Sequence, residues 1–183
     1  ARLENSSTAI SNFATNAAGS ATNDEDGLVT SDSFTAVYYP WGTTTDLAGN
    51  DVFVPPSHMV LRSLAVNDDV AFPWFAPAGI RRGVVDNATS VGFIKASTGE
   101  KQVIAVSSGI RDTLQSNRIN PISFLTGAGL TIYGQKTRHS GTSALDRVNV
   151  ARLTVFLRTQ LDKLAQPFIF EPNDELTRNE IKQ

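Results

Sequence analysis

The chain has 183 residues with a net charge of −2 at neutral pH, and 40% of its residues are hydrophobic. This length and composition predict one domain with a hydrophobic core, and the lack of a basic surplus argues against nucleic-acid binding. The sequence holds no cysteine, which excludes disulfides and thiolate metal sites. No apolar run approaches the roughly 18 residues of a membrane span, so we expect no direct membrane insertion.

The N-terminal part predicts a helix, a loop and a strand. Residues 10–17 place apolar side chains at positions i, i+3, i+4 and i+7, which indicates a helix closed by Gly19. The polar residues 20–33 are expected to form an exposed loop. Residues 34–39 favour a strand that ends at Pro40.

The next part predicts a helix between two loops. Residues 42–51 are interpreted as a loop. Ser57 follows two prolines and is expected to cap a helix that ends near residues 67–69. Residues 71–83 are rich in proline, glycine and aromatic side chains. We expect them to be an ordered loop, because aromatic rings are costly to leave in water.

Short apolar segments alternate with breaks in residues 103–133. The run 103–106 is typical of a strand buried on both faces, and Ile110 and Leu114 indicate a short helix. Residues 119–122 contain Pro121 and predict a turn. Residues 130–133 predict another strand.

The C-terminal part predicts the longest helix of the chain. Residues 135–146 are expected to be an exposed loop, and Asn149 is expected to cap a helix that ends before Pro167. Its predicted buried stripe consists of Leu153, Phe156, Leu157, Leu161 and Leu164. Residues 168–171 favour a strand and residues 175–182 a short helix. The interleaved elements predict an α+β fold, a mixed β-sheet flanked by helices in a single domain.

Three weak motifs point to chemistry. Residues 129–137 nearly match a phosphate loop, but Gln135 intrudes before the lysine and the intervening residues favour a strand. The acidic residues 24–26 lack the closing ligand of a calcium loop. His58 and His139 lie in no metal or catalytic pattern. We therefore expect no enzyme, cofactor or metal, with a nucleotide-binding enzyme domain as the alternative from another class.

One face of the long helix is mildly basic. It carries Arg152, Thr159 and Lys163, with Arg158 and Asp162 beside them. Such a face is either solvated or a docking surface for an acidic partner. Trp41, Trp74 and Phe75 are likewise either core residues or interface anchors.

Seven motifs in a fixed order resemble those of tail sheath proteins of contractile bacteriophages (myoviruses), most closely the T-even-like ones. The motifs are Tyr38–Trp41, Val54–Ser57, Trp74–Gly79, Ile119–Ile122, Tyr133–Thr137, Val148–Leu153 and Phe170–Asn173. Their landmark residues are Tyr39, Pro40, Trp41, Trp74, Pro77, Gly134, Asn149, Leu153, Phe170, Glu171, Pro172 and Asn173. Ala151 departs from the pattern, which usually has a basic residue there. We expect residues 1–183 to be a fragment of the conserved C-terminal domain, the inner and tube-proximal part.

The resemblance implies a mechanical function. Sheath subunits form stacked hexameric rings around a tail tube, and the metastable sheath contracts to drive the tube through the host envelope. The implied partners are neighbouring subunits, the tube protein, and the baseplate and tail terminator proteins, with no nucleic acid. The implied location is the virion, after assembly in the host cytoplasm. Arg152, Arg158 and Lys163 are expected to face the tube. A sheath of a tailocin or type VI-like injector is the alternative.

Overall fold

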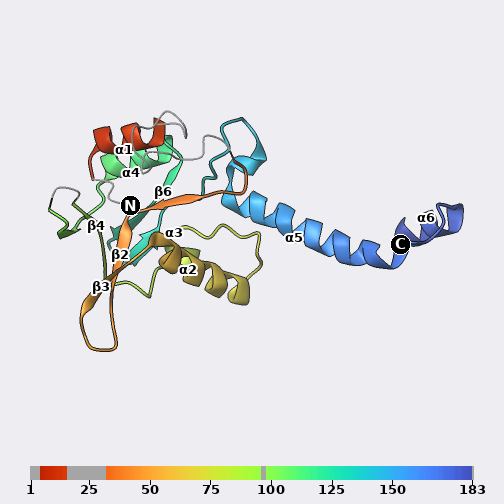
Figure 1. Ribbon diagram of the computed structural model, residues 1–183, viewed down its shortest axis with the longest axis horizontal. Coiled ribbons are helices and arrows are strands. Elements are labelled where there is room, and N and C mark those ends of the chain that lie inside the picture. Colours follow the sequence, from red (N-terminus) through yellow and green to blue (C-terminus); the bar gives the residue numbers. More distant parts are fainter. Residues whose placement is uncertain (1–4, 16–31, 96–97, 183) are drawn as a thin grey trace.

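Two small sheets and their covering helices form a domain from which one long helix projects (Figure 1). The computed structural model describes residues 5–15, 32–95 and 98–182. Its helices are α1 (Ser7–Thr15), α2 (Pro56–Val70), α3 (Gly79–Arg82), α4 (Ser108–Ser116), α5 (Val148–Ala165) and α6 (Glu175–Lys182). Its strands are β1 (Val37–Tyr39), β2 (Trp41–Thr45), β3 (Asp51–Val54), β4 (Ser90–Ile94), β5 (Lys101–Val103), β6 (Ile119–Leu125) and β7 (Gly129–Ile132). The predicted α+β class is confirmed.

The first sheet is mixed and has the order β1-β6-β7. β1 runs parallel to β6, with Val37 opposite Ile119, and β6 runs antiparallel to β7. The predicted turn around Pro121 is wrong, since Pro121 lies inside β6. The register of β6 with β7 begins only at Ile122, opposite Ile132. The Pro121 carbonyl accepts from the N–H of Tyr133 at 2.8 Å. Pro121 has no N–H to donate in return, and the Tyr133 carbonyl accepts instead from Gln115 Nε2 at 2.8 Å.

The second sheet is antiparallel and has the order β3-β2-β4-β5. The predicted loop at residues 42–51 is wrong, because the β-branched residues Thr43 to Thr45 pair with β3. Only the turn between the two strands is loop. There Asp46 Oδ1 accepts hydrogen bonds from the N–H groups of Ala48 and Asn50, at 2.9 and 2.8 Å.

The sequence pattern did not reveal β4, and it misplaced the strand after it. Gly92 in the middle of β4 breaks the apolar pattern, but a Cβ there would collide with the carbonyl oxygen of Gln102 in β5. β5 is an exposed edge strand, and Val103 is 63% exposed. The prediction of a strand at 103–106 buried on both faces is therefore wrong, although Val106 itself is buried.

The core lies in two clusters on opposite sides of β6. α2 contributes Met59 and Val60 to one cluster, which also contains Ile122 and Ile132. α1 and α4 supply the other, which joins Ile10, Leu114, Tyr39 and Ile119. Figure 1 shows α1 with α4 on one side of β6 and α2 on the other. The predicted helix end at Gly19 and most of the predicted loop at 20–33 lie outside the described residues.

Two helices begin differently from the prediction. α2 starts at Pro56 without a side-chain cap, so Ser57 does not cap it. Proline suits this position because its fixed φ is already helical and its missing N–H would have no helical partner. α5 starts at Val148 after Arg147, so Asn149 is not its cap either.

The predicted exposed loop at 135–146 is partly buried. Thr137 and Arg138 are 1% and 5% exposed. The Thr137 hydroxyl donates to the carbonyl of Leu145 at 2.7 Å, and Arg138 Nη1 donates to the carbonyl of Asn117 at 2.7 Å. Burial lowers the pKa of the Arg138 guanidinium, with a smaller contribution from Arg118. The first bond closes the segment on itself, and the second holds it against the domain.

Candidate docking surface on the projecting helix

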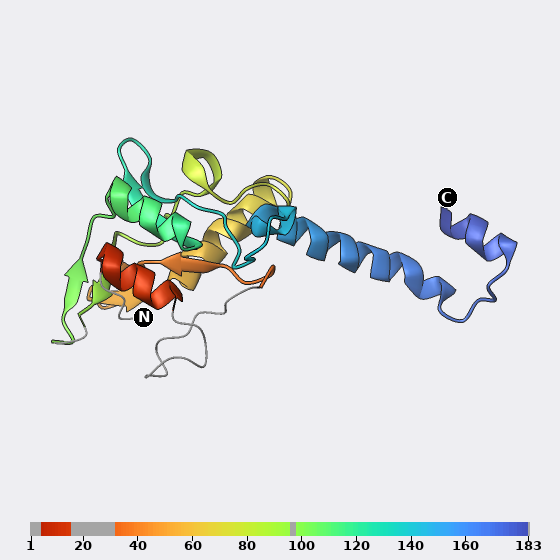
Figure 2. The same cartoon turned by 90° about the horizontal axis from the view of Figure 1, so that it is seen from above.

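α5 leaves the domain after its first turns. Val148 and Ala151 are 7% and 6% exposed, whereas Leu161 and Leu164 are 62% and 68% exposed. Figure 2 shows the helix extending away from both sheets, with α6 at its far end. The predicted buried stripe is therefore wrong for Leu157, Leu161 and Leu164. A helical period reveals an apolar face but not whether the same chain covers it.

An ion pair fixes the root of α5 to the last turn of α2. Arg152 Nη2 donates to both carboxylate oxygens of Asp68, at 2.8 and 2.6 Å. The Arg152 side chain is 22% exposed and that of Asp68 is 39% exposed. Ala151 beside it is buried, so the position that departs from the sheath pattern also packs at the root.

Aromatic rings form a second anchor. Trp74 stacks on Phe72 with ring centroids 4.7 Å apart, and the centroid of its ring lies 5.3 Å from that of Phe156 in α5. The Arg82 guanidinium lies over the ring of Phe75, 4.3 Å from its centroid. Trp74 is half-buried and connects the ordered loop after α2 to α5. The ring contact with Phe156 therefore gives Trp74 a packing role within the chain.

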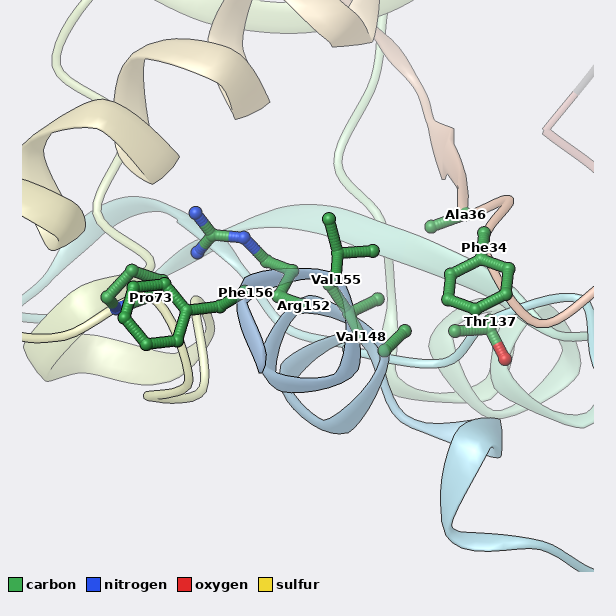
Figure 3. A pocket seen from close by; sticks show the side chains of 9 residues that line it. Phe34, Ala36, Pro73, Thr137, Val148, Arg152, Val155 and Phe156 are labelled. Carbon is green, nitrogen blue, oxygen red and sulfur yellow. The ribbon is translucent and has the colours of Figure 1, made fainter. Parts of the chain in front are cut away.

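An apolar hollow of about 290 Å³ opens beside the root of α5. Its apolar lining consists of Phe34, Ala36, Pro73, Val148, Ala151, Val155 and Phe156. Figure 3 shows Phe34 and Ala36 on one side, Pro73 and Phe156 on the other, and Arg152 between them. Arg152 Nη1 is buried and has no hydrogen-bond partner among the described residues. The hollow therefore has mainly apolar walls, and Arg152 Nη1 is enclosed beside it.

The three basic residues expected to face a tube differ in their surroundings. Arg152 is paired with Asp68 inside the chain. Arg158 and Lys163 are exposed on the projecting part of α5, as is Asp162. Of the three basic residues, only Arg158 and Lys163 therefore lie on the part of the helix that the domain does not cover.

The Phe170–Asn173 motif forms a turn between α5 and α6. The predicted strand at 168–171 is wrong, because a 3-10 turn (Gln166–Phe168) follows α5 and no described strand lies beside it. Asn173 Oδ1 accepts from Arg178 Nε at 2.9 Å. Asp174 caps α6 by accepting from the Thr177 N–H at 2.8 Å, and this bond lowers the pKa of Asp174.

The other motif residues lie inside the domain. Tyr39, Pro40 and Pro77 are buried, Trp41 starts β2, and Leu153 is half-buried on α5. A Cβ at Gly134 would lie 2.8 Å from Asn120 Oδ1, so a glycine lets this loop approach β6. The near-match to a phosphate loop is therefore strand β7 followed by a packed turn.

Asn120 is a key residue that the sequence analysis missed. It is 1% exposed. Its Nδ2 donates to the carbonyls of Val37 and Lys136, at 3.1 and 2.8 Å, and its Oδ1 accepts from the Lys136 N–H at 2.6 Å. It therefore ties β1 and the segment before α5 to β6. The only local signal was an asparagine within an apolar run.

A metal site and a membrane span are both absent from the described residues. In the described ranges, no group of three or more His, Asp or Glu side chains is placed to hold a metal ion. No helix of the described part is both long and apolar enough to cross a membrane.

The fold matches that of contractile sheaths. The cryo-EM structure of the anti-feeding prophage helical sheath in its contracted state has a TM-score of 0.67 and 24% identity, covering 87% of this chain and 39% of that one. The contracted PVC sheath complex of an extracellular contractile injection system has a TM-score of 0.65 and 24% identity, covering 84% and 38%. These likenesses show that the chain has the fold of part of a contractile sheath subunit.

Curated sequences define the family. The tail sheath protein of Vibrio phage KVP40 is 34% identical over 132 residues, which are 71% of this chain and 18% of that protein. The tail sheath protein of Enterobacteria phage T4 is 33% identical over 135 residues, 73% of this chain and 19% of that protein. No family model matches. The chain therefore belongs with the phage tail sheath proteins, as its motifs predicted, and spans less than a fifth of these relatives.

Proposed function

We propose that the chain is the tube-proximal core of a contractile tail sheath subunit. Such subunits would polymerise as stacked hexameric rings around the tail tube, between baseplate and terminator proteins, and contract to drive the tube through the host envelope. The observation that carries the proposal is the 34% identity to a phage tail sheath protein over 71% of the chain. The protein would then be a mechanical part of the virion, assembled in the host cytoplasm, and not an enzyme.

The shape of the chain supports this proposal. An asymmetric subunit whose projecting helix meets a different surface of its neighbour makes contacts that do not close on themselves, and such contacts build helical stacks. The exposed edge strand β5 leaves backbone groups available for a strand from another chain. An extended assembly of this kind can be held in a kinetic trap until it is triggered.

We further propose that the exposed cations of α5 face the tube. Arg158 and Lys163 would meet an acidic tube surface, and charge would set the register without a large apolar interface that must be separated on contraction. Arg152 would not contact the tube in the same way. Its ion pair with Asp68 would instead fix the direction in which α5 projects.

A charge-reversal experiment on the complete sheath protein tests this assignment. The double variant Arg158→Glu/Lys163→Glu should assemble poorly on purified tubes, with the loss measured by counting sheathed tubes in electron micrographs. Reversal of two exposed cations away from α5, Arg81→Glu/Lys95→Glu, is the matched control and should sheath tubes normally. Normal assembly and contraction of the α5 variant would remove these residues from the tube interface.

The sheath of a tailocin or another injector is the second candidate, and the solved neighbours favour it because they come from such systems. The local chemistry is the same in both. Genes for a capsid and for DNA packaging beside the sheath gene would decide for a phage, and their absence would decide for an injector.

A further inference from the structure

We propose that the root of α5 is a hinge, which opens and closes while the rest of the domain stays folded. Three contacts hold the first turns of α5, and we call them the joint: the Arg152–Asp68 ion pair, the ring contact of Phe156 with Trp74, and the hydrogen bond from the Val148 N–H to the Gln135 carbonyl. Opening of the joint is a motion within one subunit and is independent of the proposed assembly.

Enclosed polar atoms without a hydrogen-bond partner gather at this joint. Of the seven such side-chain atoms in the described residues, four belong to Asn67, Gln135, Asn149 and Arg152. Asn149 and Arg152 lie on the first two turns of α5, and Asn67 precedes the ion-pair partner of Arg152. An enclosed polar atom has lost its hydrogen bonds to water and gained none in return, so each of the four disfavours the closed joint.

The ion pair of the joint lacks the best geometry for its two groups. Arg152 uses Nη2 alone, which donates to both carboxylate oxygens of Asp68. The exposed pair of Arg62 and Asp86 uses two nitrogens, Nε and Nη2, each on its own oxygen at 2.8 Å. Two parallel bonds are the stronger arrangement of a guanidinium and a carboxylate. The pair in the joint therefore holds α5 while the Nη1 atom of Arg152 stays enclosed and without a partner.

The centre of the domain differs from the joint in this respect. None of the seven atoms lies on α4 or β6, and Leu114 of α4 and Ile122 of β6 are both 0% exposed. Parts of a protein with poorly satisfied contacts open locally, without global unfolding. Hinges also lie at the ends of elements, where a few residues take up the change in direction. The start of α5 meets both conditions.

Hydrogen exchange of the complete, unassembled sheath protein measures the opening. The Val148 N–H lies in a buried residue and donates across the joint to the Gln135 carbonyl at 2.8 Å, so it exchanges when the joint opens. We expect it to exchange at least about tenfold faster than the amides of β6, which require unfolding of the whole domain. Equal rates would overturn the inference, because the root of α5 would then open only by global unfolding.

Two substitutions test whether the enclosed atoms favour the opening. Asn149→Leu and Gln135→Met each remove an enclosed oxygen that has no partner in the described residues. Each should slow the exchange of the Val148 N–H about fivefold or more, because the closed joint no longer encloses that unpaired group.

Thr43→Val is the matched control for these substitutions. The Thr43 hydroxyl oxygen is also enclosed without a partner, but it lies in β2, away from the joint. This change should leave the exchange rate of the Val148 N–H as it is, since Thr43 stays enclosed when the joint opens. Asn149→Leu and Gln135→Met variants that slow the exchange no more than Thr43→Val would overturn the inference.

A further variant acts on the ion pair of the joint. Asp68→Asn removes the charge that holds Arg152 and should speed the exchange of the Val148 N–H about threefold or more. Asp86→Asn breaks the exposed pair with Arg62 and should leave that rate unchanged. An unchanged rate in Asp68→Asn would show that this ion pair does not hold the hinge closed, and the inference would fail.

Discussion

Arg152 joins two elements that are far apart in the sequence. Its pairing with Asp68 ties the root of α5 to the end of α2. The sequence could show a basic residue on a helical face, but not its partner. That partner lies on another helix, and only the packing of the domain brings the two together. The buried and unused Nη1 likewise depends on the surrounding walls, so no local pattern predicts it.

The Arg152–Asp68 pair should contribute measurably to stability. Removing either partner in Asp68→Asn or Arg152→Met leaves a half-buried charge without its counterpart. We expect each change to lower the free energy of unfolding by about 1–2 kcal/mol, between the values for exposed and buried pairs. Urea unfolding of both single variants and the double variant gives the coupling free energy between the two side chains.

The exposed pair of Arg62 and Asp86 is the control for this cycle. Its side chains are 54% and 55% exposed, so its coupling should be at most about 1 kcal/mol. If the effects of Asp68→Asn and Arg152→Met were simply additive, the two side chains would not support one another.

Among the elements, the long helices were predictable and their burial was not. The period of apolar residues located α4 and α5 closely, because a helix repeats its faces at a fixed spacing. The same period occurs in α4, which is packed against β6, and in α5, which projects. The short strands were harder to predict from the sequence. β2 follows Pro40 directly, β4 contains Gly92 and β6 contains Pro121, so local breakers masked pairing that distant strands stabilise.

Two leucines on different helices test this contrast. Leu114 in α4 is 0% exposed, whereas Leu161 in α5 is 62% exposed. Leu114→Ala should lower the free energy of unfolding by about 2–5 kcal/mol, because it leaves a cavity. Leu161→Ala should change it by no more than about 0.5 kcal/mol. Denaturant unfolding of the isolated chain measures both. A large effect of Leu161→Ala would mean that the projecting half of α5 is covered within one subunit.

In the whole molecule, strand β1 lies between the two clusters of the core. Tyr38 packs against one cluster and Tyr39 belongs to the other. The interleaving of helices and strands was enough to predict an α+β class with a mixed sheet. The division into two sheets was not predictable, because Val37 pairs with Ile119 and no nearby residue records that pairing.

These two tyrosines make the domain sensitive to alkaline pH. Burial raises the pKa of Tyr38 to about 12, opposed in part by Arg152, and burial also raises the pKa of Tyr39. The unfolded value is about 10. A raised pKa gives stability that is complete below about pH 10 and is lost as the pH rises through the folded value. The free energy of unfolding should therefore fall between about pH 10 and 12.

Phenylalanine variants assign this pH dependence. Tyr38→Phe and Tyr39→Phe should each flatten the alkaline fall in a series of urea titrations, and the double variant should flatten it most. An equally steep fall in the double variant would place its cause in other groups.

The length of α5 determines how far a small motion at its root is carried. Its 18 residues form a rod of about 27 Å at roughly 1.5 Å per residue. The Arg152–Asp68 pair lies roughly 20 Å from the far end, so a tilt of about 15° around it would swing that end by roughly 5 Å, about one helical turn. The helix is thus a lever, and a slight repacking beside α2 is magnified into a displacement of about one helical turn at its far end.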